Sequence, residues 1–246
     1  MLISLLSDLH ANLEAVEACL AHARRHGAQR FAFLGDLVGY GADAEAVVDV
    51  VARHHADGAI VLRGNHDDAV QKTGSYFNEA TRASLEWARE TLRDDQKRFL
   101  QALPLTVREG RVCYAHASAA APERWEYLDS PAAARRCADA SGADYTFCGH
   151  VHDQVLYFDT PGGRMSEFRP LPGTAIPVRG RRRWVAIVGS VGQPRDRNPA
   201  AAYALFDDVH EQITFFRVPY DAAAAAAKIR SSGLPGSLAH RVELGI

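Results

Sequence analysis

Three absences in this 246-residue sequence narrow the classes of protein that it can encode. No two of its four cysteines form a Cys-x-x-Cys pair, and their wide spacing favours reduced thiols in the core over a disulfide framework. No apolar run approaches the ~20 residues of a membrane-spanning helix, and the N-terminus lacks the basic and apolar segments of an export signal. We therefore expect a cytoplasmic protein with no membrane partner.

The sequence also lacks an excess of charge of either sign. Its 28 basic and 30 acidic residues give a net charge of -2, so no overall positive field is available to attract nucleic acid. The basic run at residues 179–183 is expected to be an exposed loop. Hydrophobic residues make up 47% of the chain and charged residues 24%, which is typical of a globular protein with a sizeable core. Nucleic acid is thus not the expected partner.

Short apolar segments of strand length recur along the chain, and several are followed by segments with helical periodicity. Strands are predicted at residues 1–6, 31–34, 59–62, 111–115, 144–148, 154–159, 183–188, 202–206 and 212–218. Helices are predicted at residues 13–23, 44–53, 78–103 and 221–228. Strands that are apolar on both faces and alternate with helices indicate an α/β fold with a largely parallel sheet. Short connections between the later strands predict a second, more antiparallel sheet.

The chain contains neither an internal repeat nor a linker long enough to divide it. We predict a single domain over residues 1–246. Residues 161–182 are rich in Pro, Gly and Arg and are expected to form a surface excursion. Residues 221–246 are expected to form a helical segment packed on the outside, because their first part is rich in alanine.

Polar residues that can bind metal follow most of the predicted strands at the point where each ends. They are Asp8 and His10, Asp36, Asn65 and His66, His116, and His150 and His152. In open α/β sheets, ligands bind beyond the carboxyl ends of the strands. These side chains should therefore converge on one edge of the sheet, although they are scattered through the sequence.

The predicted cluster combines two aspartates, one asparagine and five histidines. A mixture of oxygen donors and imidazoles suits zinc, manganese or iron. It resembles neither an all-oxygen calcium site nor a thiolate cluster. Two cations about 3.5–4 Å apart can clamp a phosphoryl group and lower the pKa of a water molecule held between them. A shared carboxylate is needed to hold them, and Asp36 is the natural candidate. The other histidines are expected to be ordinary surface or core residues, namely His22, His26, His54, His55, His210 and His240.

The ordered motifs of the chain resemble those of the calcineurin-like metallophosphoesterase superfamily. They are Ser7-Asp8-Leu9-His10, Gly35-Asp36, Gly64-Asn65-His66-Asp67, His116, and Gly149-His150-Val151-His152. The flanking segments at residues 35–41 and 189–195 are similar to a bacterial branch of small single-domain phosphodiesterases and diadenosine tetraphosphatase-like proteins. The resemblance implies a four-layer sandwich with two mixed β-sheets flanked by helices.

The resemblance also implies a role for each motif residue. One cation is assigned to Asp8, His10, Asp36 and His152. The other is assigned to Asp36, Asn65, His116 and His150. His66 is the histidine that does not bind metal in the family and instead stabilises the phosphoryl group or protonates the leaving oxygen, which suits an imidazole of ordinary pKa about 6.5.

The sequence departs from the family pattern after Asp36. Protein-phosphatase relatives have an acidic residue three positions later, which orients the catalytic histidine, followed by an arginine that holds phosphate. Here those positions are Gly39 and Tyr40, which weakens the protein-phosphatase interpretation. We expect Asp67 to orient His66, and Arg195 to hold phosphate.

Asn12, beside the first motif, could contact substrate or could cap the following helix.

The expected activity is therefore hydrolysis of a small phosphodiester or phosphoanhydride, with dinucleoside polyphosphates as the substrate class that the resemblance suggests. A nucleotide partner is consistent with four aromatic residues that could stack on a base or belong to the core, namely Tyr76, Phe77, Trp125 and Tyr127. A nuclease is the first alternative, but it would need a broad basic groove. A non-catalytic scaffold is the second, and the complete ligand set argues against it. The sequence leaves oligomerisation open.

Overall fold

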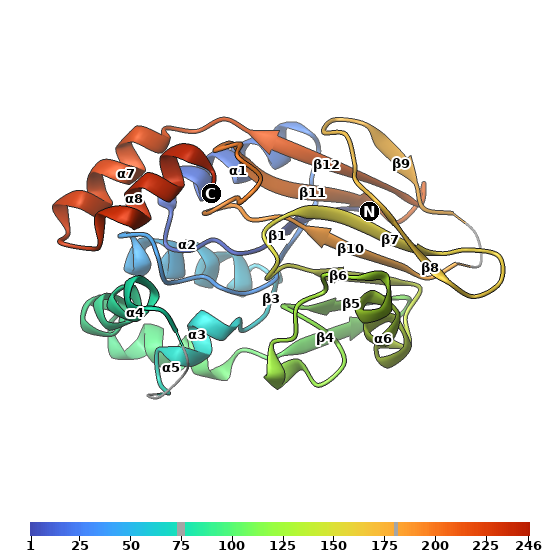
Figure 1. Ribbon diagram of the computed structural model, residues 1–246, viewed down its shortest axis with the longest axis horizontal. Coiled ribbons are helices and arrows are strands. Elements are labelled where there is room, and N and C mark those ends of the chain that lie inside the picture. The colour runs from blue at the N-terminus through green and yellow to red at the C-terminus, as the bar shows by residue number, and fades with distance from the viewer. Residues whose placement is uncertain (73–76, 180–181) are drawn as a thin grey trace.

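The computed structural model of the protein describes residues 1–72, 77–179 and 182–246. Tyr76, together with Gly180 and Arg181 of the basic run, lies outside the described residues. Within the described residues, two six-stranded sheets pack against each other, with helices on their outer sides (Figure 1).

The first sheet has the strand order β3 (Ile60–Val61), β2 (Arg30–Phe33), β1 (Leu2–Leu6), β11 (Ala201–Asp207), β12 (Gln212–Val218) and β9 (Ala175–Pro177). The second has the order β4 (Thr106–Glu109), β5 (Val112–Ala115), β6 (Tyr145–Cys148), β10 (Trp184–Val188), β7 (Gln154–Asp159) and β8 (Met165–Phe168). The helices of the described residues are α1 (Leu13–Arg25), α2 (Ala44–Ala56), α3 (Asn65–Ala69), α4 (Glu79–Thr91), α5 (Asp94–Ala102), α6 (Pro131–Ser141), α7 (Ala222–Ser231), α8 (Gly236–Leu244) and the 3-10 turn η1 (Pro122–Arg124).

Each sheet contains three neighbouring parallel strands. In the first sheet β1, β2 and β3 run parallel, and in the second β5, β6 and β10 do. The remaining neighbours pair antiparallel. Both sheets are therefore mixed, and the carboxyl ends of the parallel strands of each sheet lie together at one edge.

Strand β1 shows why the strands are apolar on both faces. Ile3 and Leu5 belong to the core between the two sheets, whereas Leu2 and Leu6 pack toward the helical layer formed by α1 and α2. This alternation follows from the two-residue period of a strand. On the far side, α6 covers the second sheet with a core that includes Cys137. The layers are therefore helices, sheet, sheet and helix, as the family resemblance implies.

The structure corrects two expectations about the chain's organisation. Strands β11 and β12 were expected in a separate antiparallel sheet, but β11 pairs with β1 and both strands belong to the first sheet. A short connection determines which strands are neighbours but not which sheet they extend. Residues 78–103 form two helices, because Leu92 and Arg93 are extended and the Gln96 side chain accepts from the Arg93 amide to start α5. Residues 161–182 contribute the edge strands β8 and β9.

All four cysteines are buried and unpaired, in agreement with the reduced-thiol interpretation. None of the helices within the described residues has both the length and the apolar character needed to cross a membrane.

Candidate metal centre

The loops that follow five strands bring the predicted donors together. Asp8 and His10 follow β1, Asp36 follows β2, Asn65 begins α3 after β3, His116 follows β5, and His150 and His152 follow β6. All except Asn65 are buried. The convergence occurs because the parallel strands of both sheets deliver their carboxyl ends to the same edge of the sandwich.

Asp36 lies between the two halves of this cluster. Its Oδ1 accepts a hydrogen bond of 2.8 Å from the backbone N–H of His66 at the start of α3. Its Oδ2 lies 3.5 Å from His116 Nε2 and 3.8 Å from His10 Nε2. One carboxylate oxygen is thus fixed by the backbone while the other faces imidazoles from two different strand ends, which is the placement that a bridging ligand requires.

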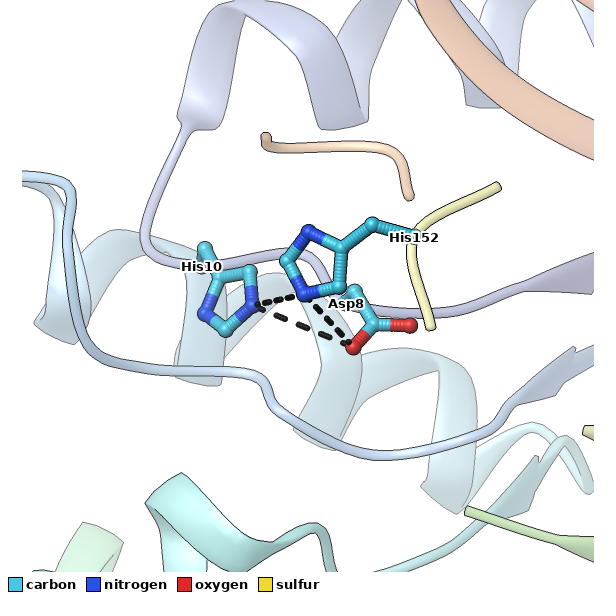
Figure 2. A group of neighbouring side chains, drawn as sticks. All are labelled: Asp8, His10 and His152. Carbon is cyan, nitrogen blue, oxygen red and sulfur yellow. Dashed lines mark hydrogen bonds and ion pairs between the residues drawn. The ribbon is translucent and has the colours of Figure 1, made fainter. Parts of the chain in front are cut away.

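Asp8 is held in the same way on one side of the cluster. Its Oδ2 accepts from the backbone N–H of His150 at 2.9 Å. Its Oδ1 lies 3.3 Å from His152 Nε2 and 3.8 Å from His10 Nε2, and Figure 2 shows these three side chains pointing at one another. Asp8 Oδ1 is fully buried and has no hydrogen-bond partner among the described residues. A buried carboxylate oxygen in this state needs a cation or a proton as its partner.

Backbone carbonyls fix the orientation of three imidazoles. His10 Nδ1 lies 3.2 Å from Val38 O, His116 Nδ1 lies 2.8 Å from Leu34 O, and His152 Nδ1 lies 2.5 Å from Gln193 O. An Nδ1–H that donates to a carbonyl leaves the lone pair of a neutral ring on Nε2, facing the carboxylates. This is the arrangement by which proteins orient metal-binding histidines.

The other half of the cluster is built around His116. Its Nε2 lies 3.1 Å from Asn65 Oδ1. In the part of the chain that the structure describes, His150 Nε2 is buried without a hydrogen-bond partner. Asp36, His116 and His150 each present a ligand atom within 4.8 Å of the others, as do Asp8, His10 and His152. Oxygen and imidazole donors that converge in this way, with orphaned atoms among them, suit divalent metal ions.

Five of the seven proposed ligands have left-handed backbone conformations. They are Asp8, His10, Asp36, His150 and His152, with φ between 48° and 70°. Each such residue costs about 1–3 kcal/mol and persists only where the surroundings enforce it. This conformation lets the chain turn sharply at a strand end. Asp8 and His10 therefore both reach the cluster, and so do His150 and His152.

The charges of the cluster are strongly coupled. Burial opposes ionisation of Asp36, but the neighbouring imidazoles, His116 foremost, hold its pKa well below the usual value. Burial also opposes a proton on His116, yet the Asp36 carboxylate raises the pKa of His116 to about 9. Burial lowers the pKa of His150 to about 3. In the metal-free protein, His116 therefore carries the proton that neutralises Asp36.

This proton makes metal affinity depend on pH. A cation must displace it, because only the neutral imidazole can bind metal. At pH values below the pKa of about 9, each decrease of one pH unit should lower the affinity for Mn²⁺ about tenfold, because one proton must leave His116 when the metal binds. Isothermal titration at pH 6.5 and pH 8, in two buffers of different ionisation enthalpy, measures both the affinity and the protons released. An affinity that does not change over this range would contradict the assignment of His116 as a ligand.

His66 lies against the cluster and is packed by aromatic rings. Its Nε2 is 4.0 Å from Asp36 Oδ2, and its ring contacts those of Tyr40 and His10 with centroids 4.6 Å and 4.8 Å away. Its Nδ1 is buried, and no group within residues 1–72, 77–179 and 182–246 forms a hydrogen bond with it. A Cβ on Gly39 would lie 2.2 Å from this nitrogen, so the ring occupies the space that an acidic side chain at position 39 would need.

Asp67 does not orient the His66 imidazole through a hydrogen bond, contrary to the expectation from the sequence. Its Oδ1 accepts from the backbone N–H groups of Leu37 and Val38, at 2.8 Å and 3.3 Å, and its Oδ2 accepts from Gly64 at 2.9 Å. Asp67 sits in the first turn of α3, where backbone amides are the nearest donors. It therefore ties the loop after Asp36 to the start of α3.

Asn12 takes the capping role and not the place of a substrate contact. Its Oδ1 accepts from Ala15 N at 3.2 Å, and its Nδ2 donates to Gly192 O at 2.9 Å and to Tyr220 OH at 3.1 Å. The side chain is buried, and its hydrogen-bonding groups are used within the protein. Asn12 is the N-cap of α1.

A cavity of about 410 Å³ opens beside the cluster. The predicted site residues in its lining are Asp36, Asn65, His66, His150, His152 and Arg195. The lining also includes Tyr40, Phe77 and Tyr127, whereas Trp125 contacts the edge of His116. The lining also includes Asn78, Thr81 and Arg241. The sequence did not predict these three, because none of them follows a strand and only the tertiary fold brings them there. The remaining predicted ligands lie buried behind this surface.

Comparisons with known proteins agree with this arrangement. Residues 1–211 match the family model described as the calcineurin-like phosphoesterase superfamily domain. The crystal structure of a metallophosphoesterase from Sphaerobacter thermophilus is similar over 100% of this chain and 99% of that one, with a TM-score of 0.88 and 33% identity. A hypothetical protein from Pyrococcus horikoshii shares the fold, with a TM-score of 0.81 and 19% identity over 100% of this chain and 98% of that one. An uncharacterized protein of Methanocaldococcus jannaschii is 32% identical over 99% of this chain and 98% of its own length. The chain belongs to the calcineurin-like phosphoesterase superfamily.

Proposed function

We propose that the protein is a hydrolase of small phosphodiesters or phosphoanhydrides that works with two divalent metal ions bridged by Asp36. The observation that carries this proposal is the position of Asp36 Oδ2, which lies 3.5 Å from His116 and 3.8 Å from His10, imidazoles that belong to different halves of the cluster. Manganese, iron and zinc all suit this mixed donor set.

Asp8, His10, Asp36 and His152 would hold one cation, and Asp36, Asn65, His116 and His150 the other. Bound there, the two ions would polarise the phosphoryl oxygens and lower the pKa of a water molecule. The protein's own residues orient these donors through Nδ1 hydrogen bonds to carbonyls and exclude water by burial.

His66 would act on the leaving group. Burial lowers its pKa to about 4, so the ring is neutral before substrate enters. A phosphate anion beside the ring favours the protonated form, because opposite charges stabilise each other in a buried site. The Nε2 edge, which lies 4.0 Å from Asp36 Oδ2, could then donate a proton to the departing oxygen.

The cavity wall favours a diester or an anhydride over a monoester. A phosphomonoester dianion needs cationic donors beyond the two metals, and arginine supplies them in a forked geometry. Tyr40 occupies the position where protein-phosphatase relatives have that arginine, and its phenol accepts a 3.3 Å hydrogen bond from Arg195. Arg195 thus reaches the cavity from a different loop than the arginine of those relatives does.

Two aromatic side chains make a nucleotide a suitable substrate. The Tyr127 ring stacks on His150 with centroids 4.2 Å apart and an interplanar angle of 28°, and 52% of the residue is exposed. Phe77 also lines the cavity, and its ring centroid lies 5.4 Å from that of His66. An exposed aromatic face at the entrance can stack on a base of any identity. This supports dinucleoside polyphosphates as the substrate class.

Hydrolysis of chromogenic and nucleotide substrates tests this proposal. Protein reconstituted with Mn²⁺ should cleave bis-p-nitrophenyl phosphate and diadenosine tetraphosphate with a higher kcat/KM than p-nitrophenyl phosphate or a phosphopeptide. Chelator-treated protein serves as the control and should be inactive on all four. A preference for phosphopeptides would overturn the substrate class, whereas full activity after metal removal would overturn the metal dependence.

A further inference from the structure

The cavity that contains Asp36 and His66 also has two arginines in its lining, which come from distant parts of the chain. Arg195 lies in the loop after β10, and Arg241 lies on α8. Figure 1 shows α7 and α8 at the same end of the molecule as α3 and α4. The metal cluster does not use either arginine, and no motif identifies Arg241.

Neither guanidinium is neutralised by a carboxylate within the part of the chain that the structure describes. The one side-chain hydrogen bond of Arg195 to the described residues is that from its Nη2 to Tyr40 OH, at 3.3 Å. The neighbouring Asp196 pairs with Arg217 instead, at 2.7 Å. Arg241 has no ion pair within 4.0 Å among the described residues, whereas Arg230 on the adjoining α7 pairs with Glu243. Half-buried arginines that share a cavity and lack a carboxylate partner have donors left to bind an anion.

The backbone fixes the two arginines relative to each other. The Arg197 N–H donates to Gly245 O at 2.8 Å, which joins the loop after β10 to the end of α8. Gly245 has φ of +67°, and a Cβ there would lie 2.5 Å from the backbone carbon of Asn198. This close approach requires glycine. The segments that carry Arg195 and Arg241 are therefore joined and line the cavity together.

Tyr40 connects these segments to the metal cluster. Its ring belongs to the apolar cluster that α7 and α8 form. The same ring contacts those of His10 and His66. Its hydroxyl reaches Arg195. Position 40 is where protein-phosphatase relatives carry a phosphate-holding arginine. Here Tyr40 stands at this position, and helices α7 and α8 pack against it.

We propose that Arg195 and Arg241 form a second phosphate-binding subsite, apart from the Asp and His cluster, which takes a phosphate group further along the chain of a polyphosphate substrate. This inference rests on the proposed function, because the scissile phosphate is taken to lie at Asp36. Guanidinium groups bind phosphate oxygens through two parallel hydrogen bonds. A substrate with a single phosphate cannot occupy the Asp and His cluster and the arginine subsite at once. The subsite therefore selects polyphosphates over simple diesters.

The Arg241→Ala variant tests the subsite with two substrates. Its kcat/KM for diadenosine tetraphosphate should fall on the order of tenfold or more, the loss expected for a hydrogen bond between charged groups. Its kcat/KM for bis-p-nitrophenyl phosphate should stay unchanged, because that substrate has no second phosphate. Arg195→Ala should lose more kcat/KM on diadenosine tetraphosphate than on bis-p-nitrophenyl phosphate, because the longer phosphate chain has more charge within its reach. Arg136→Ala is the matched control: it removes the same charge from an exposed position on α6 outside the cavity lining.

A binding measurement without catalysis accompanies the kinetics. Inorganic tripolyphosphate should raise the Tm of chelator-treated wild-type protein, and the rise should be smaller in Arg241→Ala than in Arg136→Ala. Arg241→Lys, which keeps the charge but not the fork, should be intermediate, and it replaces Arg241→Ala if the alanine variant does not fold.

The outcomes separate the subsite from the proposed function. Equal losses on both nucleotide and simple diester, or no loss on either, would overturn the subsite. If metal-loaded wild-type protein cleaves neither substrate while tripolyphosphate binding still depends on Arg241, the proposed function is wrong and the anion subsite stands. If tripolyphosphate stabilises Arg241→Ala as much as wild type, the subsite is wrong whatever the activity.

Discussion

The Asp36→Asn variant should lose more than one equivalent of metal per chain and should fall on the order of a thousandfold or more in kcat. An amide has one oxygen and no charge, so it cannot neutralise two cations at once. The Asn oxygen can still accept from the His66 N–H, as Asp36 Oδ1 does at 2.8 Å, and the fold should therefore persist. Elemental analysis of the purified, manganese-reconstituted variant measures the loss.

The matched control for this variant is Asp57→Asn, which removes a carboxylate from the exposed C-terminal end of α2. It should keep the metal content and activity of wild type. Retention of two full equivalents by Asp36→Asn would show that Asp36 does not bridge. Loss of one equivalent alone would place Asp36 on a single ion.

The His66→Ala variant should lose about 10²–10⁴ in kcat and keep its full metal content, because His66 is assigned to the leaving group and not to coordination. The loss should be smaller for p-nitrophenyl leaving groups than for diadenosine tetraphosphate, since a good leaving group needs little proton donation. His66→Gln, which keeps most of the side-chain volume among the rings of Tyr40 and His10, controls for repacking.

Metal analysis of the His66→Ala variant distinguishes two possible roles of His66, that of proton donor and that of metal ligand. His66, His10 and Asp36 present ligand atoms within 4.8 Å of one another, as the two triads of proposed ligands do. A His66→Ala protein with reduced metal content would make His66 a ligand. An activity loss that is the same for all leaving groups would remove its assignment as proton donor.

The convergence of the proposed donor residues was predictable because strand ends are visible in the sequence. Asp8 and His152 lie far apart along the chain, yet each follows an apolar strand, and parallel strands deliver such residues to one edge. The α/β class was predictable from the alternation of apolar and helical segments, and the four-layer arrangement was implied by the family resemblance. The membership of β11 and β12 in the first sheet was not, since antiparallel neighbours can extend either sheet and only packing decides between them.

The supporting interactions of the site were not predictable, because they depend on contacts between distant loops. Asp67 was expected to face the imidazole of His66, but three backbone amides lie closer. Asn12 had two compatible roles, and the positions of Gly192 and Tyr220 decide for the cap. Arg241 stands in a helix without a motif, and only the docking of α8 onto the loop after β10 brings it to the cavity.

The central claim is that two metal ions share Asp36, and anomalous diffraction from crystals of the manganese-reconstituted protein tests it most directly. The account predicts two anomalous peaks about 3.5–4 Å apart, both beside Asp36 Oδ2. One peak should lie among Asp8, His10 and His152, and the other among Asn65, His116 and His150. A single peak, or two peaks of which only one lies next to Asp36, would contradict it.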